Sequence, residues 1–374
     1  MERPHEELAR LIAFSGYRNI NAGTATRMAS LGVTPEAFFS LEPRALAAMT
    51  GLKPDYFSDS RRKEALDAGR READFVSRSN VRAIYHTDSG YPRRLAECSD
   101  APAMLFTAGN STTDYAHAVA IVGTRHATSY GAEFTRRLVE ELADALDSIV
   151  VISGLAYGID IAAHKAAISA GIPTGAVLAH GLNTIYPADH RDHARRIVAD
   201  GGFIATEYRS IDSIHRGNFL ARNRIVAGMA DVTVVVESDL RGGAMATARI
   251  ASAYNREVMA APGRAFDPYS RGCNALIASH TASLIRDTAD LIETAGWTPK
   301  PREGEQQSLD FELGDEQRGI IDFINANPGA TVNDICTGIG IPYSRLSGIL
   351  FEMEMDDILI SLPGGRYGVT ARTR

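Results

Sequence analysis

The sequence predicts an α/β protein with a parallel sheet at its centre, a helical domain before the sheet and a winged-helix domain after it. Between about 115 and 295, short apolar runs alternate with helix-like stretches, which is typical of a parallel sheet covered by helices on both faces. The chain begins with helical patterning, and a Pro-, Gly- and charge-rich segment sets its end apart. The predicted boundaries are a helical domain at 1–80, a sheet domain at 81–296, a linker at 297–312 and a winged-helix domain at 313–374.

The composition is that of an ordinary globular protein of two or three domains, with 374 residues, 45% of them hydrophobic and 23% charged. Cys98, Cys273 and Cys336 lie far apart without metal-ligand spacing, which favours a reducing compartment over a disulfide framework. The chain starts without the apolar run of a signal peptide, and no stretch approaches the roughly 20 apolar residues of a membrane span. We therefore expect a cytoplasmic protein without a metal, a cofactor or a membrane contact.

The net charge of −7 is unfavourable for contact with nucleic acid, but it is unevenly distributed along the chain. Residues 301–374 contain 12 Asp and Glu against 6 Arg, which gives −6. The remaining 34 acidic and 33 basic residues leave 1–300 at −1. A nearly neutral body can hold a local basic groove, whereas the acidic end of the chain is poorly suited to phosphate.

Residues 1–75 are predicted to form short helices. Apolar residues recur near the start at helical spacing, and prolines at 35, 43 and 54 separate further short helices. Residues 81–110 follow as a connecting segment with one or two strands.

Six apolar runs in the middle of the chain are the predicted strands of the sheet. They lie at 118–122, 149–152, 176–178, 203–205, 232–236 and 258–260. Helix-like stretches between them lie at 130–146, 159–170 and 244–254. The run at 232–236 is apolar throughout, which suits a strand buried on both faces.

The end of the chain is predicted to be a small separate domain. After the linker, helices are expected at 315–326, 331–339 and 343–355. Two short strands follow around Pro363, Gly364 and Gly365. Three helices and a hairpin make a winged helix.

The first strand leads into Gly123, Thr124 and Arg125, and then into a helix. Free backbone N–H groups at a helix N-terminus bind anions, and the forked guanidinium of Arg125 suits phosphate. The alternative is a plain strand-to-helix turn. The Gly-x-Gly-x-x-Gly pattern of dinucleotide-binding proteins is missing.

The second strand leads into Ser153 and Gly154, with Asp160 and His164 on the next helix. A Ser/His/Asp catalytic set is conceivable, but Ser153 does not stand in the Gly-x-Ser-x-Gly elbow of hydrolases. We interpret Asp160 and His164 as a local structural pair and predict no catalytic residue.

Arg222, Asn223 and Arg224 form a candidate phosphate clamp on a predicted helix. Side chains two positions apart on a helix point about 200° apart, so the two arginines cannot share one side. One is expected to face a groove while the other supports the fold through a salt bridge. A solvated basic patch is the alternative.

A fourth loop contains Gly242 and Gly243 and opens the helix that carries Thr247. It follows the strand at 232–236, and Pro262-Gly263 ends the next strand. The carboxyl ends of parallel strands lie at one edge of the sheet, so these loops should converge on one crevice. Their convergence is a stronger indication of a site than any one loop.

Together these motifs resemble those of the DprA/Smf family of DNA-processing proteins. Val-Gly-Thr-Arg, Ser-Gly-Leu-Ala-x-Gly-Ile-Asp-x-x-Ala-His and Arg-Asn-Arg-Ile occur in the family's order, and the resemblance covers roughly 80–285. It implies an extended Rossmann-like domain with a SAM-like helical domain before it and a winged helix behind. It also implies a homodimer without enzymatic activity that binds single-stranded DNA and loads RecA onto it during natural transformation and recombination.

Carried over by motif, the DNA pocket would comprise Gly123, Thr124, Arg125, Ser153, Gly154, Arg222, Asn223, Arg224, Gly243 and Thr247. The sequence departs from the family where Gly242 and Ala244 replace two serines, so phosphate contact there would depend on backbone N–H groups. Asn183 stands where the family usually has Asp, and Leu220 replaces a common Pro.

The main alternative is a nucleotide-processing enzyme of the LOG (phosphoribohydrolase) group, which resembles this chain in its loop positions. That group carries a catalytic glutamate in Pro-Gly-Gly-x-Gly-Thr-x-x-Glu, and the corresponding segment here, 241–249, lacks it. A second alternative concerns the winged helix alone, which could be a protein-interaction module. Its third helix carries Glu352 and Glu354, so phosphate repulsion disfavours a role in reading the major groove.

Overall fold

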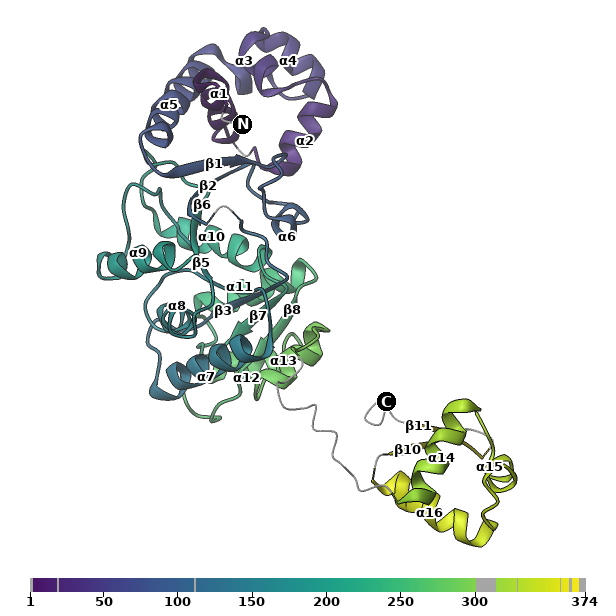
Figure 1. Cartoon of the computed structure of the whole chain (residues 1–374). Helices are drawn as coiled ribbons and strands as arrows, with labels where there is room; N and C mark the ends of the chain where they lie inside the picture. The colour runs from purple at the N-terminus through teal and green to yellow at the C-terminus, as the bar shows by residue number, and fades with distance from the viewer. Residues whose placement is uncertain are drawn as a thin grey trace. The chain divides into compact units, whose positions relative to one another are not determined.

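The computed structural model describes residues 3–18, 20–110, 112–300, 314–327, 329–356, 358–362 and 365–369. The chain divides into two compact units, residues 1–300 and 301–374 (Figure 1). Among the described helices, none is both long and apolar enough to cross a membrane.

Within the described part of the first unit, nine strands form one sheet in the order β1-β2-β6-β5-β4-β3-β7-β8-β9. The strands are β1 (Val81–Tyr85), β2 (Met104–Gly109), β3 (His117–Val122), β4 (Ile149–Ser153), β5 (Thr174–Val177), β6 (Phe203–Thr206), β7 (Val232–Val235), β8 (Glu257–Ala260) and β9 (Ser283–Leu284). Pairing is parallel from β6 to β9, and β1 and β2 add antiparallel pairs at one edge. The predicted α/β fold with a parallel sheet is confirmed.

The chain reverses its direction across the sheet at β3. It proceeds from β3 through β4 and β5 to β6 on one side, and then crosses back to β7 on the other side. The connection that follows β3 leads to β4 on one side, and the connection that follows β7 leads to β8 on the other side. A crevice therefore opens at the carboxyl ends of β3 and β7. In open α/β sheets this is where ligands bind.

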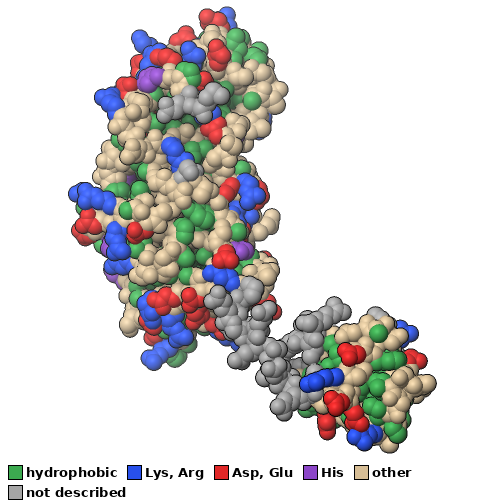
Figure 2. All heavy atoms as spheres, viewed as in Figure 1, with side chains coloured by type: hydrophobic (Ala, Val, Ile, Leu, Met, Phe, Trp, Pro, Cys, Tyr) green, Lys and Arg blue, Asp and Glu red, His purple; other side chains and the backbone are tan. Residues whose placement is uncertain are grey.

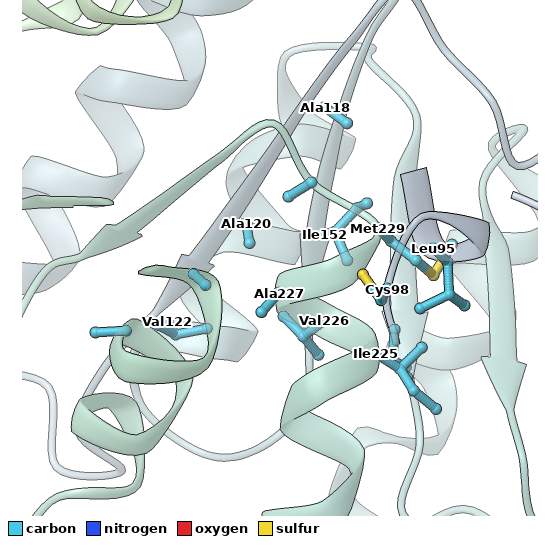
Figure 3. Packing of buried hydrophobic residues seen from close by; sticks show 14 of the residues in the cluster. Leu95, Cys98, Ala118, Ala120, Val122, Ile152, Ile225, Val226, Ala227 and Met229 are labelled. Carbon is cyan, nitrogen blue, oxygen red and sulfur yellow. The ribbon is translucent and has the colours of Figure 1, made fainter. Parts of the chain in front are cut away.

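Helices cover both faces of the sheet because alternate residues of each strand point to opposite sides. Val119 and Ile121 pack in one buried cluster with α7 (Ser129–Ala145), α8 (Ile159–Ser169) and α13 (Thr288–Ala295). The alternate residues of β3 pack in another cluster with α10 (Arg216–Gly228), α11 (Gly243–Ala253) and α12 (Arg271–Ala278). Figure 3 shows residues of the second cluster, with Ala118, Ala120 and Val122 of β3 and Ile225, Val226 and Ala227 of α10 labelled.

Two further helices belong to the first unit. α6 (Arg93–Ala96) precedes β2, and α9 (Arg191–Ala199) packs against β5 and β6. Short 3₁₀ turns η1 (Pro54–Phe57) and η2 (Ala188–His190) connect neighbouring elements.

The N-terminal helices of the first unit pack against β1 and β2, at one edge of the sheet. They are α1 (His5–Ser15), α2 (Ala22–Ser30), α3 (Pro35–Ser40), α4 (Pro43–Thr50) and α5 (Asp59–Ser77), and Figure 1 shows them at the β1 end of the sheet. Their apolar cluster also contains Tyr85, Met104 and Phe106 from β1 and β2. The helical segment therefore shares a core with the edge of the sheet.

The second unit has its own core. Helices α14 (Asp315–Ala326), α15 (Val332–Ile339) and α16 (Tyr343–Met355) and the antiparallel hairpin of β10 (Leu359–Leu362) and β11 (Arg366–Val369) surround Ile320, Ile335 and Leu346. These elements follow the predicted order of three helices and a hairpin, and their assignment as a winged helix stays an interpretation.

The predicted linker begins too early in the sequence. Trp297 packs against the cluster under α7, and its ring lies 4.8 Å from that of His117. The backbone N–H of Lys300 donates to the carbonyl of Ala145 at 2.7 Å. Residues 297–300 thus belong to the first unit, and the rest of the predicted linker, 301–312, lies outside the described residues.

The crossing of α1 and α5 offers a test of this packing. A Cβ atom on Gly69 would lie 2.3 Å from the carbonyl oxygen of Ala9, whereas one on Gly90 would meet nothing within 4 Å. We expect Gly69→Ala to lower the free energy of unfolding by about 1–3 kcal/mol because the helices must move apart. Gly90→Ala is the matched control, and urea denaturation of both variants measures the difference. Equal midpoints for the two variants would contradict the close crossing.

Candidate nucleic-acid interface

A cleft of about 660 Å³ opens at the carboxyl ends of β3 and β7, where the sequence predicts convergent loops. Its walls are the loop after β3, the loop after β7, the first half of α10 and the first turn of α11. Tyr186, from the loop after β5, and Tyr269 also line the cleft, together with Ala156 and Asp160 after β4. The cleft lies wholly within the first unit.

The loop after β3 is held in place by its neighbours, which leaves Arg125 exposed. The N–H of Thr124 donates to the carbonyl of Glu237 at 2.6 Å, and the carbonyl of Thr124 accepts from Ile159 at 3.1 Å. Gly158 has φ +77°, and a Cβ there would lie 2.1 Å from the carbonyl oxygen of Thr124. Only glycine permits this approach, so three strand ends are locked together through backbone contacts.

The N-terminus of α7 is already occupied by a carboxylate of the protein itself. Glu237 is 4% exposed and accepts hydrogen bonds from Thr128, at 2.9 Å from its N–H and 2.5 Å from its hydroxyl. A Cβ on Gly131 would lie 2.2 Å from this carboxylate. The positive end of α7 therefore faces Glu237 rather than a ligand. This differs from the sequence prediction of free backbone N–H groups at the N-terminus of this helix.

The N-terminus of α11 is open to the cleft. Its first residues Gly242 and Gly243 line the cleft, and no side chain caps this end among the described residues. A Cβ on Gly242 would lie 2.3 Å from the hydroxyl of Ser238, whereas Gly243 is exposed with open space beside it. Thr247 is buried and its hydroxyl bonds back to the carbonyl of Gly243 at 3.4 Å. This helix end is suited to an anion.

The described lining of the cleft carries more positive than negative charge. It contains four arginines against Asp160 and Asp239. Arg125, Arg216 and Arg241 are exposed, and Asp239 is paired with Arg271 at 3.0 Å. Figure 2 shows basic and acidic side chains interspersed over the face in view.

Arg222, the fourth arginine, is part of the floor of the cleft. It is 4% exposed, and its Nη1 donates to the carbonyl of Gly154 at 2.6 Å and to the carbonyl of Val177. Asp160 lies beneath the same loop and accepts from the N–H groups of Gly154, at 3.2 Å, and Ala156, at 3.4 Å. Burial raises the pKa of Asp160, and the charge of Arg222 opposes that shift. The guanidinium therefore fixes the ends of β4 and β5.

Some of the other predicted site residues line the cleft, and the rest are buried beneath it. Gly123, Thr124, Arg125, Asn223, Gly243 and Thr247 line the cleft together with Arg222. Ser153 is fully buried, and its hydroxyl donates to the carbonyl of Ile121 at 2.6 Å. Ser153 and Gly154 thus lie below the surface of the cleft.

Arg224 lies outside the cleft. It forms an ion pair with Glu207 and lines a second cavity on the other side of α10. Arg222 and Arg224 thus line different cavities on two sides of α10, as predicted, and Arg224 is the one that forms a salt bridge.

Sequence reasoning missed the aromatic side chains of the cleft. The rings of Tyr186 and Phe219 lie 5.7 Å apart, edge to face, and the guanidinium of Arg125 lies 5.7 Å from the centre of Phe219. The ring of His126 stacks on Tyr269 at 6.3 Å. Tyr186 is 51% exposed, so about half of this residue is accessible to a ligand. The sequence did contain a signal for them, because aromatic residues occur close to the arginines and the glycine-containing loops.

Comparison with known proteins agrees with this geometry. Residues 82–296 match the profile of the family described as DNA recombination-mediator protein A. The chain is also 33% identical to Protein Smf of Escherichia coli over 284 residues, which is 74% of each chain. The chain belongs to the DNA recombination-mediator protein A family. The resemblance inferred from the motifs is confirmed.

Other members of the DNA recombination-mediator protein A family agree with the fold. The chain is 35% identical to the DNA processing protein DprA of Streptococcus pneumoniae over 205 residues, 55% of this chain and 71% of the relative. The X-ray structure of that protein matches with a TM-score of 0.65 at 29% identity, over 78% of this chain and 98% of that one. DprA from Helicobacter pylori, whose structure is described for its single-stranded DNA binding mode, matches with a TM-score of 0.51 at 30% identity, over 58% and 96% of the two chains.

In this family member, Asp160 and His164 each have a structural role, but not as a pair with one another. His164 is fully buried, and its Nδ1 lies 2.7 Å from the hydroxyl of Thr174. Burial lowers the pKa of His164 to about 3, and the charge of Arg222 adds to that shift. The carboxylate of Asp160 is directed to backbone N–H groups. A histidine with so low a pKa is a weak general base, and the hydroxyl of Ser153 already donates to a carbonyl, so this arrangement is poorly suited to a nucleophilic relay.

Proposed function

We propose that this chain binds single-stranded DNA in the cleft, largely without sequence specificity. The observation that carries the proposal is the joint presence of exposed arginines, the uncapped N-terminus of α11 and open aromatic rings in one cleft. Arginines and helix N-termini hold phosphates, while aromatic faces stack on any base. The binding mode named for the Helicobacter pylori relative supports the same ligand.

The finer role follows from family membership. We propose that the protein acts as a homodimer in the cytoplasm and helps to load RecA onto single-stranded DNA during DNA uptake, natural transformation and recombination. We also propose that it is not an enzyme. The LOG-type alternative requires a catalytic glutamate near the α11 loop, and Glu237, which adjoins that loop, is buried against the N-terminus of α7. The predicted site residues remain proposed DNA contacts, with Arg222, Ser153 and Gly154 as supports and Arg224 apart from them.

Binding should favour single strands and fall with salt. Three exposed arginines, at about 0.7 counterions per phosphate contact, give a slope of about −2 for log affinity against log salt concentration. Stacking on Tyr186 and Phe219 requires bases that are free of a duplex. Fluorescence anisotropy with one oligonucleotide, single-stranded and then annealed, measures both effects across a salt series. A preference for the duplex, or affinity independent of salt, would overturn the proposal.

Arg125 should be the most informative single contact. Its guanidinium is exposed beside Phe219, and the loss of one charged hydrogen bond corresponds to roughly 10- to 150-fold weaker binding. We expect Arg125→Ala to weaken single-stranded DNA binding by that amount with the melting temperature unchanged. Arg137→Ala, on the exposed side of α7, is the charge-matched control and should have little effect. Equal affinity of the two variants would remove Arg125 from the site.

Deletion of 305–374 should leave most single-stranded DNA binding intact. The removed segment carries most of the net negative charge, and the cleft lies wholly in the first unit. We expect a change in affinity of less than about threefold, measured by gel shift at one salt concentration. A loss of more than about tenfold, or about 1.4 kcal/mol, in a folded truncated protein would mean that the C-terminal domain itself contacts DNA.

A further inference from the structure

The third helix of the second unit, α16, is apolar on two opposite faces. Leu346, Leu350 and Met353 lie on one face and are buried in the core of the unit. Phe351 and Met355 lie on the other face and are 63% and 70% exposed. A helix that is apolar all round is normally covered on every side. The outer face of α16 is therefore a candidate docking surface.

The outer face also permits the close approach of another helix. Ser344, Ser347 and Gly348 precede Phe351 and Met355 at intervals of three and four residues, which places all five on one side of α16. The three small residues are exposed, and a Cβ on Gly348 would meet nothing within 4 Å. Packed helices have axes about 8–10 Å apart, and small side chains at the contact permit the shorter distance. The first half of the outer face is thus a shallow seat, and the two large apolar side chains project beside it.

Acidic side chains border the outer face. Successive residues lie about 100° apart around a helix, so Glu352 and Glu354 lie on opposite sides of the exposed apolar pair. Arg345, the basic residue of α16, is already paired with Glu316 at 2.9 Å. In the described part of the chain, no cation pairs with Glu352 or Glu354. Both carboxylates are therefore available to basic groups from outside the chain.

These borders discriminate between possible occupants of the outer face. Carboxylates repel the phosphates of DNA and of anionic lipids. A second copy of the chain would bring the same carboxylates and the same C-terminal segment, residues 301–374, in which 12 Asp and Glu against 6 Arg give −6. A protein helix with lysine or arginine on both sides of an apolar stripe complements the apolar face and its acidic borders together.

We propose that the outer face of α16 docks a basic amphipathic helix of a partner protein. The apolar stripe of that helix lies along the seat and against Phe351 and Met355, and its basic residues pair with Glu352 and Glu354. The proposal does not depend on DNA binding, because the cleft lies in the first unit and α16 lies in the second.

Designed peptides of about 18 residues, long enough to form a helix when bound, serve as probes. The first peptide carries leucines along one helical face with lysines on both borders. The second has the same composition in an order that scatters the leucines around the helix, and the third has glutamate in place of lysine. Fluorescence anisotropy with the full-length chain should show saturable binding of the first peptide, at least about tenfold tighter than that of the other two.

Substitutions on α16 locate the bound peptide. Phe351→Ala combined with Met355→Ala removes exposed apolar surface and should weaken binding of the first peptide by at least about tenfold, with the melting temperature unchanged. Phe266→Ala is the matched control, because Phe266 is 96% exposed in the first unit, and it should leave the affinity unchanged. Glu352→Gln combined with Glu354→Gln should weaken binding at low salt and make the affinity less dependent on salt.

Equal binding of the first two peptides, or an affinity that Phe351→Ala with Met355→Ala leaves unchanged, would overturn the proposal. A dimer of the full-length chain that the same double variant dissociates, measured by sedimentation equilibrium, would instead assign the outer face to a second copy. Loss of DNA binding in that variant would assign the face to nucleic acid. The peptide titrations contain no DNA, so a failure of the proposed function in the cleft would leave this proposal standing.

Discussion

The cleft depends on one buried guanidinium. Arg222 joins the carboxyl ends of β4 and β5 through the carbonyls of Gly154 and Val177, and Asp160 supplies the opposite charge below. Removal of one partner from a buried ionic arrangement costs about 3–5 kcal/mol, because the other charge stays buried without compensation. The close fit also explains Gly154, where a Cβ would lie 2.5 Å from the guanidinium carbon. The strand ends, and the loops that follow them, take their spacing from this contact.

Glu237 determines which helix can serve a ligand. Both α7 and α11 follow glycine-containing loops at neighbouring strand ends, so the sequence makes them look equivalent. The carboxylate of Glu237 satisfies the first turn of α7 through Thr128 and leaves α11 as the helix end that faces the cleft. The single side chain of Glu237 thus places an anion of the protein at the N-terminus of α7, while the N-terminus of α11 stays open to a ligand.

The sequence predicts the parallel strands well, because strands buried on both faces are continuous apolar runs. β9 was missed since it is a two-residue strand, Ser283–Leu284, with both side chains exposed. The convergence of the loops was also predictable, because the carboxyl ends of parallel strands share an edge. The partners of the arginines were not predictable, since Arg224 meets Glu207 and Arg222 meets Val177 only through the path of the chain in space. Motif position alone therefore did not show that Arg224 lines a different cavity from Arg222.

An acidic protein can contact DNA through such a cleft because only nearby charges matter. At physiological ionic strength the Debye length is about 8 Å, so exposed acids elsewhere on the surface are largely screened. Within the cleft, Asp160 is engaged below the floor and Asp239 is paired with Arg271, which leaves Arg125, Arg216 and Arg241 to set the local potential. The aromatic rings add attraction that does not depend on counterion release. Binding to a single strand should therefore retain a component that salt does not remove, and that component distinguishes this cleft from a basic surface patch.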